Sequence, residues 1–237
     1  MNRDDKSKHM DQAVLPFFHS SFVAVSDWMS HQTGGTIELV RKKGRKMKKP
    51  KPIIIHGTGG SPEGNWFPWL ADQLRALNVE VAVPRFPTPD GQSLNNWTAA
   101  FRDQVGTLSD DMILIGHSMG VGLILRLLEK SATRVRGSFL VSGWDGLLGS
   151  EEFDPLIESF FATPFNFQTI RNQLGTTYMY HGDNDPYVPL EMAKDLASKL
   201  EVELTVIPGG GHLNKEAGYA SFPRLFDDIY KLIGTIK

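Results

Sequence analysis

The 237-residue sequence contains no cysteine, so neither a disulfide nor a thiol nucleophile is available. No apolar run approaches the roughly 20 residues that a membrane-spanning helix needs. Neither of the two common glycine-rich nucleotide-binding patterns occurs, which argues against a dinucleotide or P-loop site. Residues 13–25 come nearest to a signal-peptide core, but Pro16 and polar residues interrupt them. We therefore expect a cytoplasmic protein without a membrane span.

Charge is unevenly distributed along the chain. Residues 1–50 contain ten Lys or Arg and five Asp or Glu, whereas the remainder contains 15 and 22. The basic block at 41–49 is typical of a solvated linker, with a nucleic-acid or anionic-lipid patch as the alternative. The acidic remainder argues against nucleic-acid binding. We expect a flexible basic extension over 1–50 and one folded domain over 51–237. Because Met47 stands just before the first expected strand, residues 1–46 are expected to be dispensable.

A serine between two glycines is the most informative feature of the sequence. Gly116-His117-Ser118-Met119-Gly120 follows an apolar stretch, 112–115, and precedes a stretch with helical spacing, 121–128. A serine in G-x-S-x-G between a strand and a helix is typical of a nucleophile elbow, in which small neighbours permit a very tight turn. A bare G-x-S-x-G also occurs by chance, so the prediction depends on partners further along the chain.

An acid and a histidine follow the serine, each after an expected strand. Asp185 comes after 177–181 and His212 after 202–207 and three glycines. The order Ser, Asp, His is that of an α/β-hydrolase. Imidazole titrates near neutral pH and can activate Ser118, while the acid would fix the imidazole tautomer. Asp183 is the rival acid, but we favour Asp185 because it precedes Pro186, where the chain has already turned; Asp183 is expected to shape that turn.

An oxyanion hole needs two N–H donors. One is expected from the backbone of Met119 and the other from the glycine-rich loop after residues 53–55, with Thr58 preferred and Gly57 next. Three further histidines, at 56, 117 and 181, stand at the ends of three expected strands. We expect them to form hydrogen bonds within loops rather than to hold a metal, because no carboxylate or cysteine set has ligand spacing. No cofactor is expected.

Several stretches together resemble the small serine hydrolases related to retinoblastoma-binding protein 9 and the bacterial YdeN protein. The resemblance runs from about Lys51 to the C-terminus. It is carried by 53–57 with 65–70, by 84–89, by the 116–120 elbow, by 140–143, by 185–189 and by 210–212. It implies an α/β-hydrolase core without a large cap, a triad of Ser118, Asp185 and His212, and a carboxylesterase-like or peptidase-like activity.

The pattern of strands and helices predicts a mostly parallel sheet with helices on both faces. About six strands are expected, near 53–55, 79–83, 112–115, 137–141, 177–181 and 202–207, with helices near 190–200 and 223–233. Only about 34 residues lie between Val141, at the end of one expected strand, and Thr176, near the start of the next. This segment is too short for a lid domain. Among the aromatic residues at this sheet edge, Trp66 and Trp144 are expected to line a substrate pocket because each closely follows a strand.

The leading functional prediction is a serine hydrolase that cleaves a small ester, or an amide, through an acyl-enzyme. Two alternatives stay open. One is a binding or scaffold protein that uses the same fold with little turnover. The other is a peptidase of narrow specificity, which an acidic pocket residue would favour. A dehalogenase would need Asp at the elbow, and a lipid-droplet lipase would need a lid. The sequence does not indicate an oligomeric state.

Overall fold

A computed structural model describes residues 48–234 of the chain. The basic extension expected over 1–50 lies outside the described residues except for its last three. In the described part a five-stranded parallel sheet has its strands side by side in chain order. The strands are β1 (Lys51–Ile55), β2 (Met112–His117), β3 (Gly137–Val141), β4 (Thr176–Gly182) and β5 (Leu204–Ile207).

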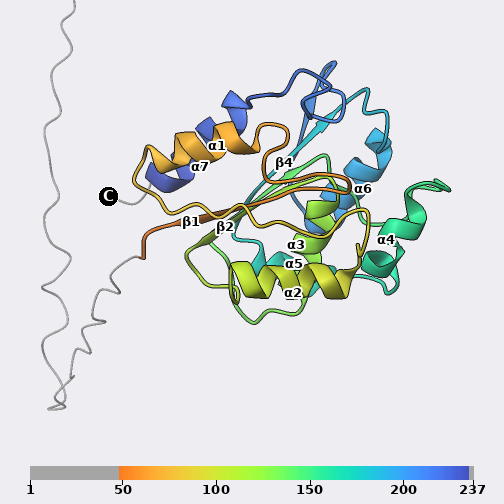
Figure 1. The fold of residues 1–237 in the computed structure, drawn as a ribbon, viewed down its shortest axis with the longest axis horizontal. Helices are drawn as coiled ribbons and strands as arrows, with labels where there is room; N and C mark the ends of the chain where they lie inside the picture. Colours follow the sequence, from red (N-terminus) through yellow and green to blue (C-terminus); the bar gives the residue numbers. More distant parts are fainter. Residues whose placement is uncertain (1–47, 235–237) are drawn as a thin grey trace, which may run out of the picture. The chain divides into compact units, whose positions relative to one another are not determined.

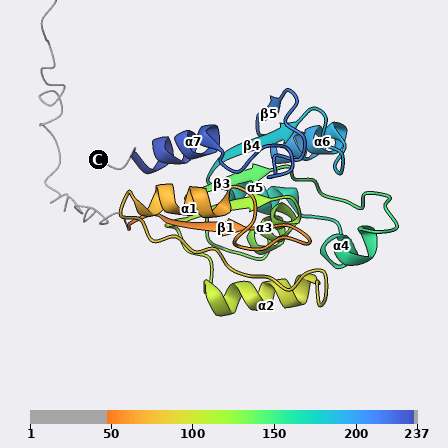
Figure 2. The same ribbon diagram turned by 45° about the horizontal axis from the view of Figure 1, so that its top comes forward.

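Seven helices of the described residues cover both faces of the sheet (Figure 1). Helices α1 (Phe67–Arg75) and α7 (Pro223–Gly234) lie on one face. The opposite core cluster contains residues of α2 (Leu94–Gln104), α3 (Met119–Glu129), α4 (Asp154–Phe161), α5 (Phe167–Gln173) and α6 (Leu190–Leu200). Figure 2 shows α1 and α2 on opposite sides of the sheet.

Strand residues alternate between the two cores. In β2, Met112 and Leu114 belong to the core under α3, whereas Ile113 and Ile115 belong to the core under α1 and α7. The central strands β2 and β3 are buried along their whole length. Parallel strands covered on both faces read as continuous apolar runs, which is how these segments appear in the sequence.

The prediction of about six strands is wrong in one place. Residues 79–83 contribute only an isolated bridge between Ile53 and Ala82, formed by hydrogen bonds on both sides of Ala82. Pro84 follows directly and Pro87 comes three residues later, and proline has no N–H with which to extend a ladder. The apolar residues of this segment instead cover the edge of the sheet beside β1, so their hydrophobic pattern reflects packing.

The α/β class and the lack of a large cap are confirmed. Between β3 and β4 the chain forms only the short helices α4 and α5, and α5 packs against α3. Within residues 48–234, no helix is both long and apolar enough to cross a membrane. The loops after the carboxyl ends of the strands are therefore left to form the site, as is usual in open α/β sheets.

Candidate active site

Ser118 occupies a strained turn between β2 and α3. Its φ of 57° and ψ of −126° lie in a region that a residue with a side chain avoids, at a cost of about 1–3 kcal/mol. The turn is held by a hydrogen bond from Ser118 N to Val141 O of 2.9 Å. A Cβ on Gly120 would lie 2.5 Å from Ile55 O, and one on Gly116 would lie 2.7 Å from Ile124 Cδ1. Glycine is therefore required on both sides of this serine.

Asp185 lies in the loop after β4 with its side chain fully buried. One carboxylate oxygen, Oδ1, accepts hydrogen bonds from the backbone amides of Tyr187 at 2.9 Å and Val188 at 3.0 Å. The other, Oδ2, lies 2.7 Å from His212 Nδ1. Burial by itself would raise the pKa of Asp185, but the hydrogen bond and charge of His212 and the two amides hold that pKa below its ordinary value. Asp185 is therefore a carboxylate that fixes the orientation of His212.

Asp183 and Asn184 have a different task. Asp183 Oδ1 accepts from Gly209 N at 2.8 Å, and Asn184 Oδ1 accepts from Gly211 N at 2.7 Å. These two bonds join the loop after β4 to the glycine loop after β5. Asp183 thus shapes the turn, whereas Asp185 contacts the histidine.

The backbone of His212 is fixed as firmly as its ring. Its carbonyl accepts hydrogen bonds from His117 Nε2 at 2.9 Å and from Ser142 Oγ at 3.1 Å. Because a carbonyl only accepts, Nε2 of His117 carries the proton. His117 is completely buried, and burial, followed by the charge of His212, lowers its pKa to about 3. It is neutral at physiological pH.

The two other histidines at strand ends are also neutral structural groups. His56 Nδ1 lies 2.8 Å from Gly57 O, and His56 Nε2 accepts from Phe86 N at 3.0 Å. His181 Nε2 lies 3.0 Å from Val188 O and 3.6 Å from Asp185 Oδ2. Burial lowers the pKa of both rings. Among residues 48–234 no cluster of three potential metal ligands occurs.

The glycine-rich loop after β1 approaches Ser118 closely. A Cβ on Gly57 would lie 2.7 Å from Ser118 Cβ and 3.0 Å from Ser118 Oγ. Gly59 N donates to Thr88 Oγ1 at 2.7 Å, and Gly60 N donates to Gly57 O at 3.1 Å. Because those two amides are engaged, the amides of Thr58 and Gly57 are left as the candidate donors toward a substrate oxygen. Gln92 Nε2 donates to Thr58 Oγ1 at 2.8 Å and so anchors this loop. No pattern in the sequence indicated this contact.

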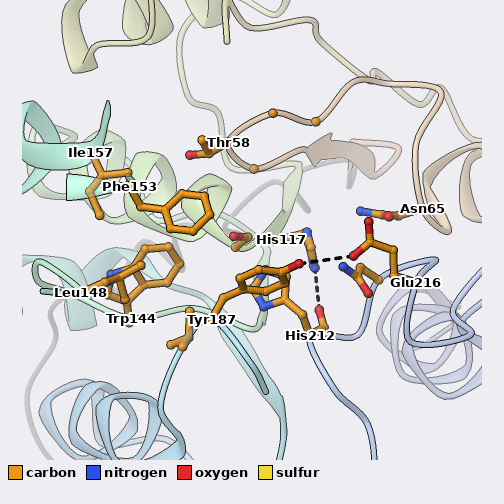
Figure 3. A pocket seen from close by; sticks show the side chains of 16 residues that line it. Thr58, Asn65, His117, Trp144, Leu148, Phe153, Ile157, Tyr187, His212 and Glu216 are labelled. Atoms are coloured by element: carbon orange, nitrogen blue, oxygen red, sulfur yellow. Dashed lines mark hydrogen bonds between the residues drawn. The ribbon is translucent and has the colours of Figure 1, made fainter. Parts of the chain in front are cut away.

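These loops enclose a pocket of about 260 Å³. Ser118, His212, Thr58 and Trp144 all line it. Figure 3 shows Trp144 among the side chains of Leu148, Phe153 and Ile157, which form an apolar wall. The side chains of Asn65 and Glu216 lie at the opposite end, beyond Tyr187 and His212.

The expectation that Trp66 lines the pocket is wrong. Trp66 is fully buried in the core under α1 and α7, where its ring packs edge-on against Phe67 and Phe222. Its Nε1 donates to Leu213 O at 2.9 Å. Trp66 therefore supports the segment that follows His212 from beneath and does not face the pocket.

Sequence reasoning missed four of the residues that line the pocket. Phe153 and Ile157 lie at the start of α4 or within it, Tyr187 follows Asp185 by two residues, and Glu216 follows His212 by four. Tyr187 and Glu216 could have been suspected from their nearness in the chain to the acid and the histidine. The α4 residues gave no such signal, because they reach the pocket only through the packing of α4.

Three features together define the α/β-hydrolase class. They are a parallel sheet with helices on both faces, an elbow after β2, and an acid after β4 that is paired with a histidine after β5. The model of the serine hydrolase family matches residues 52–231. The chain belongs to this family.

Two relatives, one of them also known from a crystal structure, are similar to this chain. The putative hydrolase YdeN of Bacillus subtilis (strain 168) is 31% identical over 176 residues, covering 73% of this chain and 91% of YdeN. Serine hydrolase RBBP9 of Rattus norvegicus is 22% identical over 165 residues, covering 68% and 86% of the two chains. The crystal structure of the B. subtilis ydeN gene product superposes with a TM-score of 0.72 at 28% identity, over 78% of this chain and 99% of that one. The resemblance predicted from the motifs is confirmed.

Proposed function

We propose that this hydrolase cleaves small carboxylic esters, with amides as the second candidate, through an acyl-enzyme on Ser118. The observation that carries the proposal is the 2.7 Å contact between Asp185 Oδ2 and His212 Nδ1, because His212 and the strained Ser118 line the same pocket. Since Nδ1 of His212 faces the acid, Nε2 is the ring nitrogen left to act on Ser118. Serine at its free pKa is a weak nucleophile and needs such a base.

In the first half-reaction Ser118 Oγ bonds to the substrate carbonyl carbon while its proton passes to His212 Nε2. The carbonyl oxygen becomes an oxyanion that the N–H groups of Met119 and Thr58 stabilise. Met119 begins α3, so its amide is among those that a helix leaves without an intrahelical acceptor. The bond to the alcohol then breaks as His212 returns the proton to the leaving oxygen.

In the second half-reaction a water molecule attacks the acyl-enzyme. His212 takes one water proton and gives it to Ser118 Oγ as the acid departs. Throughout, Asp185 keeps the imidazole in one tautomer and stabilises the imidazolium. A cytoplasmic location is part of this proposal, since a chain without cysteine has no need of an oxidising compartment.

The test is labelling with a fluorophosphonate probe, followed by peptide mapping. We expect the probe on Ser118, with labelling lost in Ser118→Ala and reduced by at least about a hundredfold in His212→Ala. Circular dichroism and a melting curve check that both variants fold. Folded wild-type protein that takes up no probe would contradict the proposal and favour a binding protein with this fold. Labelling at another serine would contradict the assignment of the nucleophile.

A further inference from the structure

The pocket is chemically divided along its length. Trp144, Leu148, Phe153 and Ile157 make one end apolar, while Asn65 and Glu216 make the other end polar (Figure 3). Ser118 and His212 also line this pocket. A substrate bound at Ser118 therefore has an apolar environment on one side of its reacting bond and a polar one on the other.

Glu216 is the single carboxylate among the residues that line the pocket, and no lysine or arginine lines it. The neighbouring Lys215 is exposed and does not line the pocket. The Glu216 side chain points toward Tyr187, whose hydroxyl donates to Oε2 at 3.3 Å. The charge of Glu216 is the main reason that the pKa of Tyr187 is raised. The polar end of the pocket is thus electronegative and has no built-in counter-ion.

The chemistry decides which part of the substrate meets this end. His212 must give its proton to the leaving alcohol, so the alcohol lies on the side of His212. The ring of Tyr187 is 5.0 Å from that of His212, measured between centroids, and its hydroxyl reaches Glu216. Glu216 and Tyr187 therefore stand beside the alcohol, and the acyl group is left with the apolar wall.

On the basis of the proposed function, we propose that Glu216 and Tyr187 form a cation subsite, which makes esters of an apolar acid with a positively charged alcohol the preferred substrates. The carboxylate supplies the negative charge. The Tyr187 ring, itself 41% exposed, supplies an aromatic face of the kind that binds quaternary ammonium groups. Both groups are partly open to water, so the preference is moderate and weakens with salt.

The experiment compares two esters of the same size. Choline hexanoate carries a quaternary ammonium, and 3,3-dimethylbutyl hexanoate carries the same shape without charge. The readout is the ratio of kcat/KM for the charged ester to that for the neutral ester. At low salt we expect the ratio of the full-length wild type to be about five times that of Glu216→Gln, in which the amide oxygen can still accept from Tyr187 and the aromatic face remains.

Glu203→Gln is the matched control because it removes the same charge at an exposed position before β5, at the sheet edge away from the site. Its ratio should equal that of the wild type. A ratio that is the same in Glu216→Gln and Glu203→Gln, with both esters hydrolysed, would overturn the cation subsite and leave the hydrolase proposal standing. If Ser118 takes up no probe and neither ester is hydrolysed, the proposed function itself fails and the subsite with it.

Discussion

The side chain of His117 fixes the backbone of His212, because His117 Nε2 donates to the His212 carbonyl at 2.9 Å. The residue that precedes the candidate nucleophile therefore fixes the loop that carries its base. Ser142 Oγ adds a second bond to the same carbonyl at 3.1 Å. The last residue of β2 and the residue directly after β3 thus anchor the loop that follows β5. The sheet therefore determines where His212 lies relative to Ser118.

The first prediction concerns His117 and acid stability. Burial lowers its pKa from 6.5 to about 3 in the folded protein. The folded state therefore binds fewer protons than the unfolded state between these values, and the contribution of His117 to stability, complete above about pH 6.5, is lost as the pH falls toward 3. Urea unfolding of wild type and His117→Phe between about pH 6 and pH 4 should show a steeper loss in the wild type, by up to about 1.4 kcal/mol per pH unit.

Parallel pH dependences of the two proteins would contradict that prediction. At neutral pH His117→Phe is expected to be less stable by about 1 kcal/mol, since it leaves the His212 carbonyl with one donor fewer. Because the wild type loses more stability on acidification, this difference should shrink and then reverse as the pH falls toward 4. The comparison therefore rests on the slopes and not on the absolute free energies.

The second prediction separates the two acids after β4. Asp185→Asn should lower kcat by about 10⁴-fold, because the amide cannot stabilise the imidazolium and favours the wrong tautomer. Asp183→Asn keeps an oxygen that can accept from Gly209 N and should lower kcat by less than about tenfold. Steady-state kinetics on a short-chain ester measure both. Equal losses would show that the 2.7 Å contact of Asp185 with His212 does not decide the chemistry.

The third prediction uses two glycines in one loop. Gly57→Ala would place a Cβ 2.7 Å from Ser118 Cβ, so either the loop or the serine must move, and a displacement of about 1 Å costs on the order of 10² in rate. Gly59→Ala meets nothing within 4 Å, although its φ of 67° makes the substitution strained by about 1 kcal/mol. Activity should therefore fall far more in Gly57→Ala, while melting temperatures fall in both. Similar activities in the two variants would contradict the close approach at Ser118.

The fourth prediction distinguishes two tryptophans that look alike in the sequence. Trp66→Phe removes the bond to Leu213 O and should lower the free energy of unfolding by about 1–2 kcal/mol, with the same relative rates on esters of different acyl groups. Trp144→Ala enlarges the pocket at its apolar end and should shift kcat/KM toward bulkier acyl groups by about tenfold. A change of acyl preference in Trp66→Phe would mean that its ring reaches the substrate after all.

Much of the fold and the nucleophile region could be predicted because the signals are local. The elbow needs small residues on both sides of Ser118, and the apolar runs of β2 and β3 follow from burial on both faces. The segment 79–83 has the same composition as a strand, but its ladder ends after Ala82 because two prolines follow. Composition indicates burial, and it does not by itself say how many residues will pair.

The pocket was harder to predict because it depends on packing between segments that are far apart in the chain. Trp66 and Trp144 both follow a strand, yet one rotates into the core under α1 and the other lines the cavity. The direction of each ring depends on its aromatic partner. Trp66 packs against Phe222, which is far from it in the sequence, and Trp144 packs against Phe161, which belongs to α4. Glu216 becomes a candidate binding residue only because the fold brings Tyr187 next to it in the pocket.

The positions of α1 and α7 in the chain have a consequence for folding during translation. In the described part of the chain these two helices cover one face of the sheet, and α7 is the last element to be synthesised. All five strands can emerge before α7, so Tyr180, whose hydroxyl donates to Asp228 of α7 at 2.9 Å, lacks this cover while they pair. The core on that face is therefore incomplete until Leu225 and Ile229 of α7 have been synthesised.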